Sequence, residues 1–171
     1  ESLFQSIIDW FERRHNWVIE PEWILMAPGI VPSLFAAVQA FTQEGEGVIV
    51  QSPVYFPFFS AVETNNRKLI NNPLREINGR WEIDFEHLEF CAKQNARLLL
   101  LCTPHNPVGR VWLQVELERV LEIARRYDLT ILSDDIHCDL VYSGVAHTML
   151  ARLAQPGDKI ITTIAPNKTF N

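Results

Sequence analysis

Apolar positions along the chain switch repeatedly between two periodicities. Short continuous apolar or β-branched runs, typical of buried strands, occur at 23–27, 48–50, 68–70, 97–102, 129–133 and 159–165. Between these runs apolar residues recur at i, i+3 and i+4, which predicts helices over about 1–15, 32–41, 55–62, 84–93 and 114–127. Strands that alternate with helices predict an α/β fold, a three-layer αβα arrangement around a mostly parallel sheet.

Local signals add detail to this pattern. The Asn78-Gly79 dipeptide favours a two-residue hairpin turn, and Asp84 is placed to cap the helix that follows it. The chain contains no internal repeat, low-complexity tract or obvious linker, and 171 residues suit a single core. We therefore expect one domain over residues 1–171.

Composition excludes several classes of function. The chain is 47% hydrophobic with a net charge of −6, which argues against a basic nucleic-acid surface. No apolar run approaches the ~20 residues that cross a bilayer. Cys91, Cys102 and Cys138 are odd in number and irregularly spaced, so a disulfide framework is not expected and a reducing compartment is favoured. The sequence predicts a cytoplasmic protein with no nucleic-acid or membrane partner.

Polar residues follow five of the predicted strands. Ligands of open α/β sheets bind beyond the carboxyl ends of the strands, so these positions are the first candidates for a site. They comprise a glycine turn at a helix start, an aromatic ring, an amide, a carboxylate pair with a histidine, and an amine: Gly29-Ile30-Val31, Tyr55, Asn106, Asp134-Asp135-Ile136-His137 and Lys168.

Each of these positions also has an ordinary structural interpretation. Gly29 can be a simple turn, Tyr55 a half-buried core residue, and Asn106 the start of an Asn-Pro-Val-Gly turn. Asp134 can cap a helix, and a lone lysine such as Lys168 after a strand is usually solvated.

A metal site is a further alternative for the acidic segment. The segment contains three carboxylates, Asp134, Asp135 and Asp139, together with His137. Adjacent carboxylates on an extended segment point in opposite directions, and the sequence shows no second cluster of ligands that would complete a metal site. No metal site is predicted. The remaining histidines are interpreted as surface or loop residues: His15, His87, His105 and His147.

The combination of these features is more specific than its parts. A glycine turn, Tyr, Asn-Pro-x-Gly, Asp-x-x-His and Lys in this order resemble the large domain of pyridoxal-phosphate enzymes of the aspartate-aminotransferase fold, fold type I. Within that group, the segments "APGIVPSL", "SPVYFPF", "LLCTPHNPVGRVW", "LSDDIHCDLVY" and "NKTFN" look like the MalY/PatB branch of cystathionine β-lyases. The resemblance covers essentially the whole chain and implies pyridoxal 5′-phosphate as the cofactor.

The resemblance implies catalytic roles at three positions. Lys168 would attach the cofactor as a Schiff base and then act as the general base on the substrate Cα proton. Asp134 would keep the pyridine nitrogen protonated. His137 would reach the 3-oxygen of the ring, and it stands where many relatives carry a tyrosine.

The resemblance also implies binding roles. Asn106 would contact the 3-oxygen together with His137, and Tyr55 would stack on the ring. The backbone N–H groups of Gly29, Ile30 and Val31 would receive the phosphate at a helix start. The sequence departs from many relatives at Ala165, where a serine often contacts the phosphate.

Parts of the family's architecture are absent from these residues. The resemblance implies an N-terminal arm, a sheet strand after the lysine and a C-terminal small domain, and a homodimer in the full-length protein. We therefore expect residues 1–171 to be a partial large domain that neither folds stably nor catalyses alone.

The leading functional prediction is a carbon–sulfur β-lyase that cleaves L-cystathionine or related cysteine conjugates to a thiol, pyruvate and ammonia. One alternative is an aminotransferase of class I or II, which uses the same residues. Another is a non-catalytic regulatory or binding protein that retains the fold. The identity of the amino acid substrate stays open.

Overall fold

The computed structural model describes residues 2–171, so Glu1, at the start of the first predicted helix, lies outside the described residues. The elements alternate largely as predicted: α1 (Leu3–His15), η1 (Pro21–Trp23), α2 (Ile30–Phe41), β1 (Gly47–Val50), α3 (Pro57–Glu63), β2 (Lys68–Asn71), β3 (Arg75–Ile77), β4 (Arg80–Glu82), α4 (Phe85–Ala92), β5 (Ala96–Cys102), α5 (Gln114–Arg126), β6 (Thr130–Asp134), η2 (Leu150–Leu153), β7 (Lys159–Thr163) and η3 (Pro166–Lys168).

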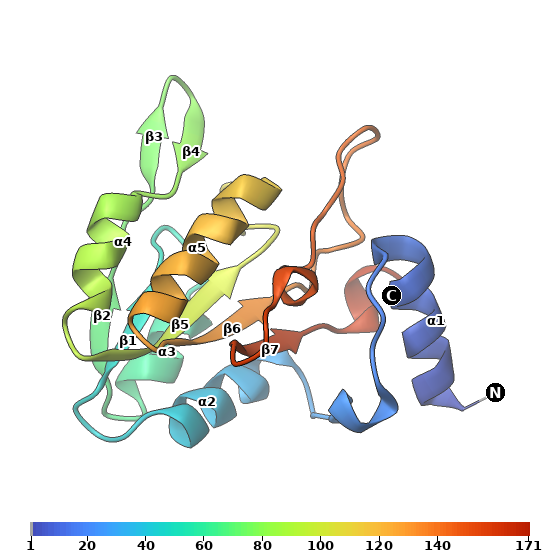
Figure 1. Ribbon diagram of the computed structural model, residues 1–171, viewed down its shortest axis with the longest axis horizontal. Helices are drawn as coiled ribbons and strands as arrows, with labels where there is room; N and C mark the ends of the chain where they lie inside the picture. The colour runs from blue at the N-terminus through green and yellow to red at the C-terminus, as the bar shows by residue number, and fades with distance from the viewer. Residues whose placement is uncertain (1) are drawn as a thin grey trace.

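Five of the strands form one parallel sheet in the order β2-β1-β5-β6-β7 (Figure 1). The carboxyl ends of the three last strands are in register, with Cys102 opposite Asp134 and Asp134 opposite Thr163. Loops that leave β5, β6 and β7 therefore start side by side at one edge of the sheet. The predicted parallel α/β architecture is confirmed.

Alternate residues of the central strands bury opposite faces of the sheet. On one face Leu98 and Leu100 pack in a core with α2 and α3, and on the other Leu99 and Leu101 pack with α4 and α5. The continuous apolar run of β5 is explained by this burial on both faces, since neither face meets water.

The strand predicted at 23–27 is wrong. Pro21–Trp23 form the short helix η1, and the following residues belong to no strand. Leu25 is 88% exposed and Met26 is 66% exposed, so this apolar run is not buried against the sheet. Hydrophobic content alone suggested a strand here, but a strand also needs a neighbour to pair with its backbone.

Two local predictions are confirmed on the α4 side of the molecule. Asn78 and Gly79 both adopt positive φ in the turn between the antiparallel strands β3 and β4, as a two-residue hairpin turn requires. Asp84 caps α4 by accepting a hydrogen bond from the His87 N–H at 3.0 Å.

A third, smaller core lies between α1 and the loops beyond β6. It contains Phe11, Ile19, Cys138 and Met149. Figure 1 shows α1 next to the carboxyl-terminal segment that follows β7, away from the helices that cover the sheet. The first helix therefore packs near the loops at the carboxyl edge of the sheet, where the predicted site residues are found.

Candidate active site

Asp134 ends β6 with its side chain among buried groups. The residue is only 4% exposed, and its Oδ1 accepts weak hydrogen bonds from the Ile136 N–H at 3.3 Å and the Thr163 hydroxyl at 3.5 Å. Burial raises the pKa of the Asp134 carboxyl to about 7, and the adjacent Asp135 adds to this effect. No lysine, arginine or histidine of the described residues forms an ion pair with Asp134.

Lys168 and His137 follow the neighbouring strands β7 and β6. Lys168 ends the short helix η3, which follows β7, and its side chain is exposed. Burial lowers the pKa of the His137 imidazole, and the positive charge of Lys168 lowers it further. Both residues therefore lie beyond the carboxyl ends of paired strands, at one edge of the sheet.

Hydrogen bonds join the loops that carry Tyr55 and Asn106. The Tyr55 N–H donates to the Asn106 carbonyl at 3.1 Å, and the His105 imidazole contacts the Pro53 carbonyl at 2.9 Å. Tyr55 precedes α3 rather than lying inside the helix predicted for 55–62, and it is 40% exposed. Its ring is therefore accessible beside the Asn106 turn.

The start of α2 supplies backbone donors. Gly29 is the N-cap with φ 142°, a conformation that side chains rarely allow, and no side chain from residues 2–171 caps the helix. The first-turn N–H groups of Ile30 and Val31 have no partner within a helix. Because α2 ends shortly before β1 begins, its start lies toward the carboxyl edge of the sheet (Figure 1).

Some of the predicted site residues are linked to one another by strand pairing or hydrogen bonds, and others are not. Backbone pairing brings the ends of β5, β6 and β7 together. Asp134 ends β6, whereas Asn106 and Lys168 lie in the segments that follow β5 and β7. Tyr55 joins them through its hydrogen bond to Asn106. Gly29, Ile30 and Val31 reach this edge through the direction of their helix, without a direct contact to the other positions.

The prediction that the remaining histidines are surface or loop residues is wrong for His15, which is buried in α1, and for His87, which is half-buried in α4. His105 and His147 lie in loops as predicted, but in buried positions. His15, His105 and His147 are at most 7% exposed. The His147 Nε2 lies 2.7 Å from Asp135 Oδ1, and the His15 Nε2 lies 2.9 Å from Asp139 Oδ1. Two of the three carboxylates considered above as metal ligands, Asp135 and Asp139, are therefore partners of buried imidazoles.

One group of potential metal ligands is found in the described part of the chain. Atoms of His15, Cys138 and Asp139 lie within 4.8 Å of one another. The His15 imidazole and the Asp139 carboxylate are already hydrogen-bonded to each other. Burial raises the pKa of the Cys138 thiol.

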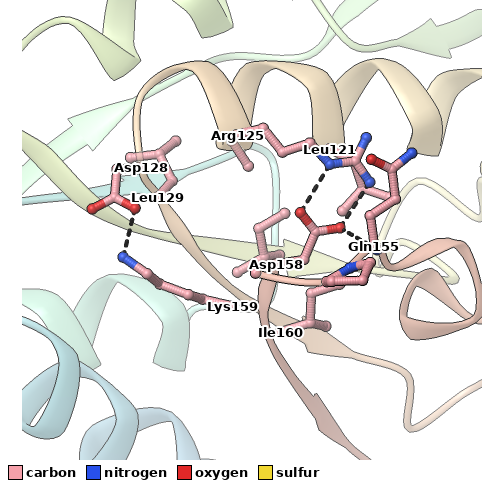
Figure 2. A pocket seen from close by; sticks show the side chains of 12 residues that line it. Leu121, Arg125, Asp128, Leu129, Gln155, Asp158, Lys159 and Ile160 are labelled. Carbon is pink, nitrogen blue, oxygen red and sulfur yellow. Dashed lines mark hydrogen bonds and ion pairs between the residues drawn. The ribbon is translucent and has the colours of Figure 1, made fainter.

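A pocket of about 200 Å³ lies at the opposite end of the sheet. Figure 2 shows that its charges pair internally: Arg125 binds Asp158 through two contacts of 2.8 and 2.7 Å, and Lys159 binds Asp128 at 2.6 Å. It borders the amino ends of β6 and β7, away from Asp134. These paired charges leave little free charge for a ligand.

Comparison with known proteins identifies a family and several relatives. The family model described as aminotransferase class I and II matches residues 1–167. Cystathionine beta-lyase PatB of Bacillus subtilis (strain 168) is 44% identical over 168 residues, which are 97% of this chain and 43% of that protein. Kynurenine–oxoglutarate transaminase 3 of Bos taurus is 31% identical over 179 residues, 99% of this chain and 39% of that protein.

A solved structure shows the same likeness in three dimensions. The crystal structure of cystalysin from Treponema denticola, which contains a pyridoxal 5′-phosphate cofactor, matches with a TM-score of 0.95 and 44% identity. The match covers 98% of this chain and 43% of that one, so the chain spans less than half the length of these relatives. The predicted fold and family resemblance are confirmed. No helix within residues 2–171 has the length and apolar character to cross a membrane.

Proposed function

Because the chain belongs to the aminotransferase class I and II family, we propose that the protein is a pyridoxal-phosphate-dependent carbon–sulfur β-lyase acting on L-cystathionine or related cysteine conjugates. The observation that carries this proposal is the buried Asp134 carboxylate, which has no cationic partner among residues 2–171 and stands at the same sheet edge as Lys168. Residues 1–171 would then be part of the cofactor-binding large domain.

The residues present fit the cofactor. A desolvated carboxylate with a pKa raised to about 7 suits a site whose missing partner is a cation, and a protonated pyridine nitrogen is such a partner. The uncapped start of α2 suits a phosphate, because backbone N–H groups and the helix dipole both favour an anion there. When bound, pyridoxal phosphate supplies an electron sink for the pair of electrons left at the substrate Cα.

The other roles in binding and proton transfer fall to residues of this chain. Asp134 would hold the proton on the pyridine nitrogen, and Asn106 and His137 would donate hydrogen bonds to the 3-oxygen. Tyr55 covers one face of the ring and excludes water from it. The Lys168 amine would hold the cofactor and would serve as the base for the substrate Cα proton.

The proposed reaction breaks two bonds of the substrate. Lys168 receives the proton of the Cα–H bond, and the electron pair of that bond forms the Cα–Cβ double bond as the Cβ–S pair departs with the thiolate. Hydrolysis of the unsaturated amino acid then gives pyruvate and ammonia. The 44% identity to the PatB lyase supports β-elimination.

A direct assay tests the proposal. The intact protein, loaded with pyridoxal phosphate, should release pyruvate and thiol from L-cystathionine without any added 2-oxo acid. A Lys168→Ala variant, made in parallel, should release neither. If the native protein forms pyruvate no faster than this variant, the lyase proposal fails.

The second candidate is an aminotransferase, which the family description and the bovine relative favour. It predicts amino-group transfer that depends on an added 2-oxo acid, with no thiol released from cystathionine. A non-catalytic protein with the same fold predicts neither activity, even when cofactor binds.

We further propose that the complete protein is a cytoplasmic homodimer. The three cysteines are free and buried, which supports a reducing compartment. Sedimentation analysis of the intact protein tests the dimer, and a single species of monomer mass would contradict it.

A further inference from the structure

The turn that carries Lys168 rests on α1. Phe170 packs edge-on against Trp10, with ring centroids 4.9 Å apart. The N–H groups of Thr169 and Phe170 both donate to the Pro166 carbonyl, at 3.1 and 2.8 Å, and close the turn. Figure 1 shows this carboxyl-terminal segment beside α1, about 160 residues along the chain from it.

One carboxylate connects the two segments. Asp139, on the loop after β6, accepts a hydrogen bond from the Trp10 Nε1–H at 3.2 Å and another from the Thr169 hydroxyl at 3.3 Å, both on Oδ2. Its Oδ1 contacts His15 Nε2 at 2.9 Å. The Asp139 side chain is only 7% exposed, so these bonds are largely shielded from water.

We propose that Asp139 is a positioning residue that fixes the Lys168 turn against α1. Hydrogen bonds to an ionised acceptor are about twice as strong as neutral ones, and here they join three segments distant in sequence. Thr169 is covalently adjacent to Lys168, so its hydroxyl contact limits where the lysine backbone can move. The expected catalytic consequence rests on the proposed function, whereas the structural consequence does not.

The structural consequence is measured on the cofactor-free intact protein by amide hydrogen exchange. Exchange at the Phe170 amide reports directly on the stability of the turn, because its hydrogen bond to the Pro166 carbonyl closes the turn. Asp139→Ala should speed exchange at this amide by about tenfold, since it removes charge-assisted bonds. The matched control is Asp9→Ala, which removes a carboxylate of α1 that accepts from Gln5 on the same helix, and it should leave the Phe170 amide unchanged.

A second pair of variants isolates the single contact nearest the lysine. Thr169→Val removes the hydroxyl and should speed exchange at the Phe170 amide by about fivefold after correction for intrinsic rates. Thr169→Ser keeps the hydroxyl and should restore the native rate. If Asp139→Ala does not fold, this pair decides: equal rates in the valine and serine variants overturn the proposal.

The catalytic consequence is read from the loaded protein. Asp139→Ala and Thr169→Val should lower kcat with a smaller change in KM, and Thr169→Ser should recover it, because a displaced amine affects proton removal more than substrate binding. Unchanged exchange in a folded Asp139→Ala protein overturns the positioning role. Two results together would separate the claims. If the native protein binds no cofactor, while the Phe170 amide of Asp139→Ala exchanges faster than that of the native protein, the proposed function is refuted and the positioning role stands.

Discussion

Replacing Asp134 with asparagine should stabilise the cofactor-free protein at neutral pH. The carboxyl is 4% exposed, and burial raises its pKa from 3.8 to about 7. Asparagine keeps the shape but has no charge to desolvate. The residue that we expect to bind the cofactor is therefore expected to weaken the fold when the cofactor is absent.

The sign and size of this effect follow from proton linkage. Below about pH 4 the Asp134 carboxyl is protonated in both folded and unfolded chains and costs nothing. As pH rises toward 7 the unfolded chain ionises first, so the native protein progressively loses stability relative to Asp134→Asn. The pKa shift of Asp134 from 3.8 to about 7 corresponds to about 4 kcal/mol at pH 8, taking about 1.4 kcal/mol per pH unit.

Urea unfolding of the cofactor-free intact protein from pH 4 to pH 8 measures this difference. The free energy of unfolding of Asp134→Asn should exceed that of the native protein by an amount that grows with pH. Asp158→Asn is the control of opposite sign: a hydrogen bond from Arg125 lowers the pKa of Asp158, so the native carboxylate stabilises the fold throughout this range and loses this effect only below about pH 4. A pH-independent difference for Asp134→Asn would refute the reasoning.

Three further outcomes are expected. Saturating pyridoxal phosphate should reverse the order of stability and make the native protein more stable than Asp134→Asn, because the bound cation then pairs with the carboxylate; calorimetry checks this, and an unchanged order contradicts it. Gly29→Ala, at φ 142°, should weaken binding of pyridoxal phosphate more than binding of pyridoxal, which lacks the phosphate, in titrations of visible absorbance; equal losses would remove the phosphate from this helix start. Leu100→Ala, at a position 1% exposed between the sheet and its helices, should lower the free energy of unfolding by about 2–5 kcal/mol in urea titrations, and a loss below about 1 kcal/mol would contradict the packing described.

Hydrophobic patterns predicted the sheet well because its central strands are buried on both faces. The run at 97–102 became β5, and the run at 129–133 became β6 with a shift of one residue. The same reasoning failed at 23–27, where an apolar run stays exposed and unpaired. A run of apolar residues indicates burial somewhere, but it does not specify the strand that must lie next to it.

The position of residues at or just beyond strand ends was predictable from the sequence. Asp134 and Lys168 could be placed together because parallel strands end at one edge. Asp139 and His15 could not, because their contact joins positions 124 residues apart through the packing of α1. The spacing Asp-x-x-His-x-Asp was visible, but no local pattern indicates that an N-terminal helix supplies the partners of its last carboxylate.

Reduction of the cofactor-loaded intact protein with borohydride, followed by peptide mapping, tests the central claim most directly. Lys68, Lys93, Lys159 and Lys168 are the lysines of this chain, and borohydride fixes the cofactor to the lysine that binds it. We expect the pyridoxyl group on the peptide that contains Lys168. A pyridoxyl group on another lysine, or on none, would contradict the account.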